Sequence, residues 1–236
     1  MFDYETDQER PPGETPASHR KKVYSLERFL SDLLWLAANT DGLTAVYLDR
    51  ELDPPLREAV MLSVAYENRC RYCSFMHGEW AIEAGLDPEV ERELIGLEPE
   101  QVPAEIWKAS LYARRRASRD FAPIVLRERR LLAEHFTPRQ QYLLEVTART
   151  MAVANLVGNS FDALLSRMRG EPVPHSQFGD EILFGALFAL AAPFGAALLA
   201  VLTGHHPLEL LTRFLQFSEV FERRVSEGRL HSIDEL

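Results

Sequence analysis

The spacing of apolar residues along the chain constrains its fold more than any other feature. From Ser25 onward, leucine and phenylalanine recur every three or four positions, as in the run from Leu26 to Leu36. This period places the apolar side chains on one face of an α-helix, and no strand-like alternation of any length occurs in the 236 residues. Helices with such stripes bury them by packing against one another. We therefore predict an all-α fold.

Polar residues followed by proline mark several helix starts. Asp53-Pro54, Asp87-Pro88 and Thr137-Pro138 each combine an N-cap with proline at the first helical position. Ser25 is a further N-cap, and Asp41-Gly42 predicts the end of the first helix. The helix that starts after Asp87-Pro88 is expected to run to about residue 95, and the one after Thr137-Pro138 is expected to be long.

Two more helices are expected over residues 106–119 and 124–135, which contain the arginine-rich runs ARRRASR and RERR. The chain holds 36 Asp and Glu against 26 Lys and Arg, a formal net charge of −10. We expect these arginines to lie on solvent-exposed helix faces and to pair with the acidic side chains of the chain. We do not interpret them as an anion-binding patch. Because the chain is acidic and has no basic stripe, we expect no nucleic-acid partner.

The residues suited to catalysis gather between Glu58 and His77. Cys70 and Cys73, the only cysteines, form a C-x-x-C, and His77 follows Cys73 at i, i+4 spacing. On a helix that begins near Cys70, both sulfurs and the imidazole share one face, and the helix start favours a thiolate. Glu58 lies on the preceding helical run. A helical hairpin would bring its carboxylate to the His77–Cys73 pair, directly or through one water.

The motif E-x11-C-x-x-C-x3-H, with REAV around Glu58 and a tyrosine before Cys73, resembles the redox branch of the AhpD-like alkylhydroperoxidases, within the carboxymuconolactone decarboxylase superfamily. The resemblance covers residues 54–84. Tyr72 departs from it, because some members have a histidine there. The resemblance implies an AhpD-like fold built around helical hairpins, an internal duplication and a homo-oligomer.

We expect the chain to consist of three parts. Residues 1–22, polar and without periodicity, predict a flexible N-terminal tail. Residues 23–170 are the expected AhpD-like helical domain, and residues 171–236 a C-terminal helical extension packed on the core or on a neighbouring subunit. Aligning Pro138 with Pro55 suggests that the long helix region repeats the first hairpin without its chemistry.

The resemblance also implies the activity. Glu58 and His77 would relay a proton from a cysteine, whose thiolate reduces a hydroperoxide, and the second cysteine would then form a disulfide. A protein or small-molecule thiol must restore the dithiol. Spacing and resemblance favour Cys73 as the attacking sulfur, whereas thioredoxin-like proteins would favour Cys70. We expect the disulfide to be exposed enough for exchange, and we expect no cofactor, because neither G-x-G-x-x-G after a strand nor a P-loop occurs.

Other functions stay open for the same residues. A redox-sensing or electron-transfer adaptor would use the C-x-x-C with little peroxidase turnover. A zinc site would need a fourth ligand from elsewhere, so we expect no metal. A decarboxylase or isomerase, like the non-redox branch of the superfamily, has no use for a dithiol.

Residues 182–204 carry no charge over 23 positions, which is long enough to span a bilayer. Pro193 in the middle and many small residues favour a pair of buried helices that pack closely against other helices or subunits. A membrane span remains an alternative. Two cysteines and the lack of an apolar signal-peptide core predict a cytoplasmic location.

Overall fold

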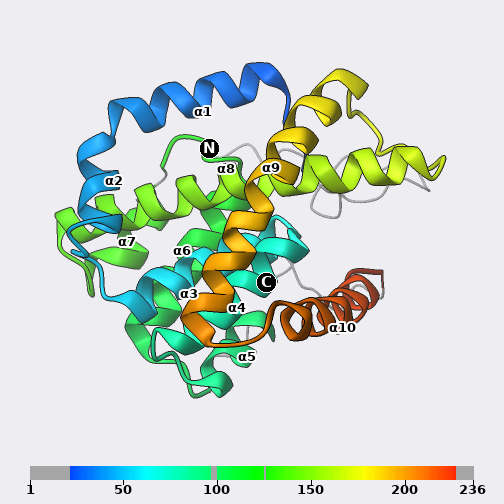
Figure 1. Cartoon of the computed structure of the whole chain (residues 1–236). Helices are drawn as coiled ribbons and strands as arrows, with labels where there is room; N and C mark the ends of the chain where they lie inside the picture. The colour runs from blue at the N-terminus through cyan, green and yellow to red at the C-terminus, as the bar shows by residue number, and fades with distance from the viewer. Residues whose placement is uncertain (1–21, 97–99, 125, 227–236) are drawn as a thin grey trace.

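The computed structural model describes residues 22–96, 100–124 and 126–226, and within these ranges the chain forms helices and no strand. The all-α prediction is confirmed. In chain order the helices are α1 (Leu26–Ala38), α2 (Thr40–Tyr47), α3 (Pro54–Glu67), α4 (Arg71–Glu83), α5 (Pro88–Gly96), α6 (Ala104–Ser118), α7 (Leu126–Ala133), α8 (Pro138–Met168), α9 (Phe178–Thr203) and α10 (Pro207–Ser226) (Figure 1). The predicted tail lies, up to residue 21, outside the described residues.

The first helix does not stop at Asp41-Gly42 as predicted. Ser25 caps α1, the chain bends at Asn39, and α2 then continues through Gly42. A Cβ on Gly42 would lie 2.7 Å from the Tyr142 hydroxyl and 2.8 Å from the Val146 side chain. The glycine therefore permits close packing of α2 on α8 and does not end a helix.

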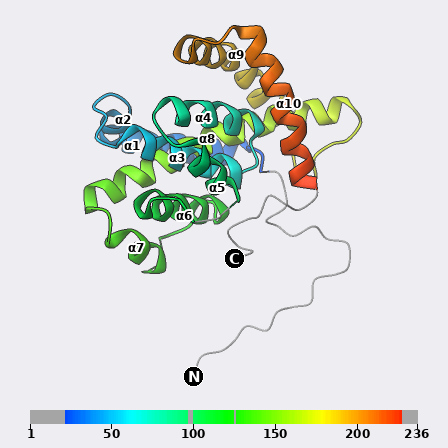
Figure 2. The same ribbon diagram turned by 90° about the horizontal axis from the view of Figure 1, so that it is seen from below.

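Helix α3 is the centre of the molecule and packs against α4, α6 and α8. Ten of its residues are buried, so it presents no polar face to water. Figure 2 shows α4 between α3 on one side and α9 on the other. The hairpin that carries the predicted site thus lies inside the helical stack.

Helix α8 begins as predicted, with a capping box between Thr137 and Gln140. It then runs uninterrupted for 31 residues, so the predicted second hairpin is wrong. The first hairpin turns where Arg69 adopts a positive φ of 55°. The corresponding stretch around Val153 stays helical although Asn155 and Gly158 have low helix propensity, because packing of α8 on α3 and α9 overrides that local preference.

The arginine-rich helices also differ from the prediction. Arg114 and Arg116 are 1% and 2% exposed, so α6 does not turn all its arginines to solvent. Arg116 binds Glu145 of α8 through hydrogen bonds of 2.8 and 2.9 Å, and the Tyr112 hydroxyl donates to the same carboxylate at 2.7 Å. This bidentate pairing satisfies the buried charges and joins α6 to α8.

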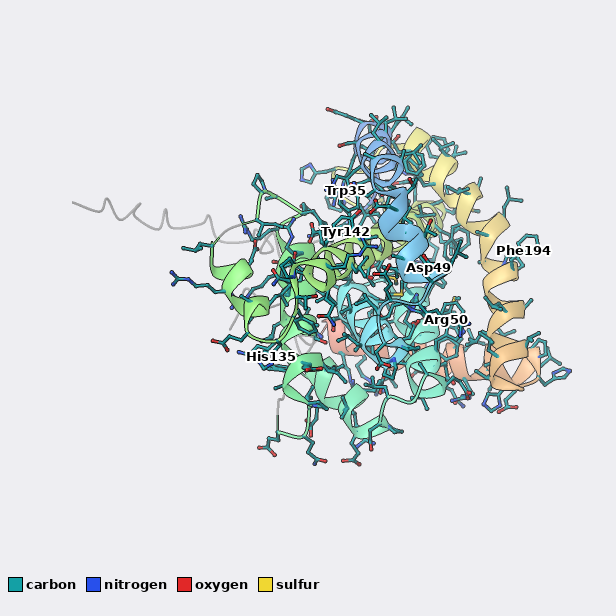
Figure 3. The ribbon with its side chains drawn as sticks, turned by 90° about the vertical axis from the view of Figure 1, so that its left-hand side faces the viewer. Trp35, Asp49, Arg50, His135, Tyr142 and Phe194 are labelled. Carbon is teal, nitrogen blue, oxygen red and sulfur yellow. A yellow bond between two sulfur atoms is a disulfide. The ribbon has the colours of Figure 1, made fainter. Side chains whose placement is uncertain are left out.

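The uncharged segment is one helix, α9, with Pro193 inside it, and not the predicted buried pair. Only 17% of its most apolar stretch of 18 residues is buried. Among the described helices it alone is long and apolar enough to cross a membrane, judged by length and composition. It packs on α8 and α4, while α10 packs on α4 and α9. Figure 3 shows Phe194 on the side of α9 that points away from the other helices.

Candidate functional site

The turn between α3 and α4 places Cys70 at a helix start, as predicted. Cys70 is the N-cap of α4, and its sulfur accepts the Cys73 backbone N–H at 3.4 Å. Helix α8 holds this turn in place. The Asn159 side chain donates to the Asn68 carbonyl at 2.7 Å, and the Asn68 side chain donates to Asn155 at 3.2 Å. The position of the cysteines therefore depends on residues about ninety positions later in the chain.

Cys70 and Cys73 form a disulfide with a Cα–Cα distance of 5.4 Å, within the usual range. The predicted exposure is wrong for the single chain, because Cys70 is 0% and Cys73 8% exposed. Helix α8 covers Cys70. A Cβ on Gly158 would lie 3.0 Å from the Cys70 sulfur and 3.3 Å from the ring of Phe188. Cys73 is the more exposed of the two residues.

Glu58 and His77 meet directly, without an intervening water. The Glu58 Oε2 and His77 Nδ1 atoms are 2.7 Å apart, and the Glu58 side chain is 6% exposed. The other carboxylate oxygen accepts hydrogen bonds of 3.0 and 2.8 Å from Arg57. Burial tends to raise the Glu58 pKa, but the hydrogen bonds that His77 and Arg57 donate to the carboxylate, together with the Arg57 charge, outweigh burial and hold that pKa below its ordinary value.

The ionised carboxylate determines how His77 can act. Because Glu58 only accepts hydrogen bonds, His77 Nδ1 must carry the proton and donate it, which leaves Nε2 for a thiol or a substrate. The Trp80 ring contacts the imidazole edge-on, with ring centroids 5.0 Å apart. The contact limits rotation of the ring. His77 also lies one turn beyond Cys73 on α4, at the spacing that the sequence predicts.

A second polar group beside the cysteines escaped the sequence analysis. The Tyr72 hydroxyl and an Arg71 Nη2 each donate to Asp162 of α8 at 2.6 Å. Burial and the Asp162 charge raise the Tyr72 pKa above its ordinary value, so the phenol stays protonated at neutral pH. Arg71 also donates to Ser218 of α10 at 2.9 Å. No motif links these residues, because the fold alone brings them together.

Within the described residues, no group of three or more His, Cys, Asp and Glu side chains could hold a metal ion. Residues 34–114 match the model of the Carboxymuconolactone decarboxylase family. This range contains Glu58, both cysteines and His77, whereas α7 to α10 lie outside it. No curated protein and no solved structure matches the chain.

Proposed function

Because residues 34–114 match the model of the carboxymuconolactone decarboxylase family, we propose that the chain is a thiol-dependent peroxidase of AhpD-like type. One observation carries the proposal. A cysteine pair at disulfide distance begins the same helix whose His77 is bonded to a buried carboxylate. Such a pair suits two-electron redox chemistry, and the His–Glu pair suits proton transfer.

In the reduced protein, His77 Nε2 accepts the proton of the Cys73 thiol, and Glu58 stabilises the imidazolium. The thiolate attacks the outer oxygen of a hydroperoxide ROOH. An S–O bond forms as the O–O bond breaks, and the proton from His77 passes to the departing alkoxide, which leaves as ROH. The sulfur is oxidised by two electrons to a sulfenic acid, and the peroxide is reduced by two.

Cys70 then closes the cycle. Its sulfur attacks the Cys73 sulfur, an S–S bond forms, the S–O bond breaks, and the hydroxide leaves as water with the Cys70 proton. A dithiol reductant, protein or small molecule, attacks the disulfide and carries away the two electrons. Because Cys70 is fully buried, we assign the reductant's attack to Cys73.

A second candidate is a redox-sensing or electron-transfer adaptor with little peroxidase turnover. The burial of the disulfide supports low peroxidase turnover, since enclosed sulfurs react slowly with small oxidants. The two functions differ in rate, because the adaptor's thiols would be oxidised by a protein partner and hardly at all by a hydroperoxide.

The test is to reduce the full chain, add tert-butyl hydroperoxide and follow free thiols, with mass analysis for the disulfide. We expect loss of two thiols per chain. Cys70→Ser is expected to consume one peroxide and retain a sulfenic acid on Cys73, whereas Cys73→Ser stays unreactive. Intact thiols in the unsubstituted protein would contradict peroxidase function, and a reactive Cys73→Ser would reverse the two sulfur roles.

We also propose a homo-oligomer in the cytoplasm. Exposed apolar side chains support the oligomer, since α9 presents Leu190, Phe194 and Val201 at 71%, 78% and 79% exposure. A monomeric soluble protein rarely exposes a large contiguous apolar patch. A second copy of the chain would cover this face of α9. The alternative is that α9 contacts a membrane, and it is tested by whether protein expressed without detergent stays in the supernatant.

A further inference from the structure

A cleft that combines aromatic and charged side chains lies between α10 and the helices α3, α4 and α5. Its volume is about 450 Å³, within the ~300–1,000 Å³ that is usual for small-molecule sites. It is lined by none of the candidate redox residues Glu58, Cys70, Cys73 and His77. A ligand in this cleft would therefore occupy a site separate from the cysteines, and its binding does not depend on the proposed peroxidase function.

The inner wall of the cleft is aromatic. Tyr66, Phe75 and Phe221 line it and are 2%, 8% and 3% exposed. The Phe217 ring centroid lies 5.7 Å from that of Phe75 and 5.6 Å from that of Phe221. An apolar ligand body would leave water and contact these rings, which favours its binding.

The charged side chains of the cleft are three arginines and two glutamates, namely Arg92, Arg213, Arg224, Glu79 and Glu91. Arg213 forms an ion pair of 2.7 Å with Glu79, and Arg92 forms one of 3.3 Å with Glu89. Within residues 22–96, 100–124 and 126–226, Arg224 forms no ion pair, although its charge acts on Glu91. The cleft thus offers a positive charge to a ligand, in a chain whose formal net charge is −10.

Glu91 adds a group that can donate a proton in a hydrogen bond. A Cβ on Gly78 of α4 would lie 3.2 Å from the Glu91 Oε1 atom, so the carboxyl group rests against the backbone of α4. No group in the described part of the chain donates a hydrogen bond to it. Burial raises the Glu91 pKa to about 7, so near neutral pH a share of the molecules carries the protonated carboxyl.

We propose that this cleft binds a small carboxylate with an apolar body, such as an arylalkanoate. The ligand carboxylate accepts hydrogen bonds from Arg224 and from the protonated Glu91, and the apolar body lies against the aromatic wall. The charges select against a cationic ligand, because the arginines outnumber the glutamates. A neutral ligand would leave the Arg224 charge without a partner.

Calorimetry of the full chain at pH 6 tests the ligand class with three probes of one shape: 3-phenylpropionate, 3-phenylpropionamide and 3-phenylpropylamine. The carboxylate should bind most tightly. Arg224→Gln should weaken its binding by about three- to tenfold, since one charged hydrogen bond at an exposed side chain is lost. Val220→Trp, which narrows the cleft, should weaken the binding of all three probes.

Arg223→Gln is the matched control, because it removes the same charge from the neighbouring residue of α10, which does not line the cleft. It should leave the affinity unchanged. Equal weakening by both arginine variants would reduce the binding to general charge attraction and overturn the proposal. The absence of saturable carboxylate binding, or tightest binding of the amine, would also overturn it.

A pH series tests the part of Glu91. The groups that face its carboxyl are Tyr66 of α3, Glu79 of α4, Arg92 of α5 and Arg213 and Arg224 of α10. As pH rises from 6 to 8, Glu91 loses its proton and repels the carboxylate, so the affinity should fall by up to about tenfold. Glu91→Gln should bind with little pH dependence. A fall of the same size in Glu91→Gln would contradict the hydrogen bond from Glu91, whereas peroxide consumption by the reduced chain decides the peroxidase function separately.

Discussion

At the scale of single residues, the site depends on which buried groups keep their charge. Glu58 is ionised despite its burial, because Arg57 and His77 both donate to it. Glu91 of α5 differs, since burial and the nearby Glu79 charge raise its pKa to about 7, although Arg92 and Arg224 oppose them. The local partners, and not burial alone, decide the protonation state of each carboxyl group.

Glu58→Gln should slow thiol oxidation by about ten- to ten-thousand-fold at neutral pH, the usual range for a positioned acid–base group. An amide can still accept the Nδ1 hydrogen bond but cannot stabilise an imidazolium. Stopped-flow measurement of thiol loss checks the change, and His77→Ala should give a loss in the same range. Exposed Glu89→Gln is the control. Equal rates in all four proteins would show that no relay operates.

The Glu91 pKa predicts a pH dependence of stability. Its folded pKa of about 7 lies above the ordinary glutamate pKa of 4.5, so the folded state binds more protons than the unfolded state between these pH values. Stability should therefore fall as pH rises from about 4.5 to 7, by roughly 1–3 kcal/mol from this group. Urea unfolding at pH 5 and pH 7.5 should show a smaller fall for Glu91→Gln than for the unsubstituted protein. A parallel fall in both proteins would contradict the assignment, and Glu89→Gln should behave like the unsubstituted chain.

At the scale of elements, α8 acts as the support of the α3–α4 hairpin. It holds the turn through Asn155 and Asn159, binds Tyr72 and Arg71 through Asp162, and covers Cys70 at Gly158. Helix α10 is joined to the same hairpin by the Arg71–Ser218 hydrogen bond. Helices far from the motif in sequence therefore fix the geometry of the cysteines.

Gly158→Ala should lower the free energy of unfolding by about 1–3 kcal/mol, because the new methyl group would press on the Cys70 sulfur and on Phe188. Gly179→Ala is the matched control in α9, where nothing lies within 4 Å of the new Cβ. That change should be neutral or slightly stabilising, since alanine favours helix over glycine. Urea unfolding of both variants measures the difference. If Gly158→Ala changed the free energy of unfolding no more than the control does, α8 would not be packed closely against the disulfide at this position.

At the scale of the whole molecule, exposed apolar side chains gather on α9, α10 and α1 of a chain whose formal net charge is −10. Figure 2 shows α9 and α10 on the outside of the helical stack. The most exposed apolar side chains of α9, Phe194 and Val201, are 78% and 79% exposed. We expect contact between copies of the chain to involve α9.

Phe194→Glu tests this contact, because the side chain is 78% exposed in the single chain and a second copy would bury the new charge. The unsubstituted protein should show an oligomer mass in light scattering, and the variant should shift towards the monomer. Leu48→Glu is the control, since that residue is 76% exposed at the end of α2. An oligomer unchanged by Phe194→Glu would place the interface elsewhere, and a monomeric unsubstituted protein would contradict the assembly.

The sequence by itself determined the helical class, most helix starts and the residues of the hairpin site. These features depend on neighbours within a few positions: Ser25 and Thr137 cap helices through residues three positions later, and Cys73 and His77 lie one turn apart on a single helix. The spacing of residues within a few positions therefore suffices to predict helix caps and which side chains share a helix face.

Only the tertiary structure decided what depends on contacts between distant segments. The burial of Cys70 under α8, the Tyr72–Asp162 hydrogen bond and the ion pair of Arg116 each join residues far apart in the chain. The predicted second hairpin and the buried helix pair were wrong for the same reason. Whether a helix breaks at a given position, and whether its apolar face is buried, depends on which other helices pack against it. The spacing of residues along the sequence does not identify those helices.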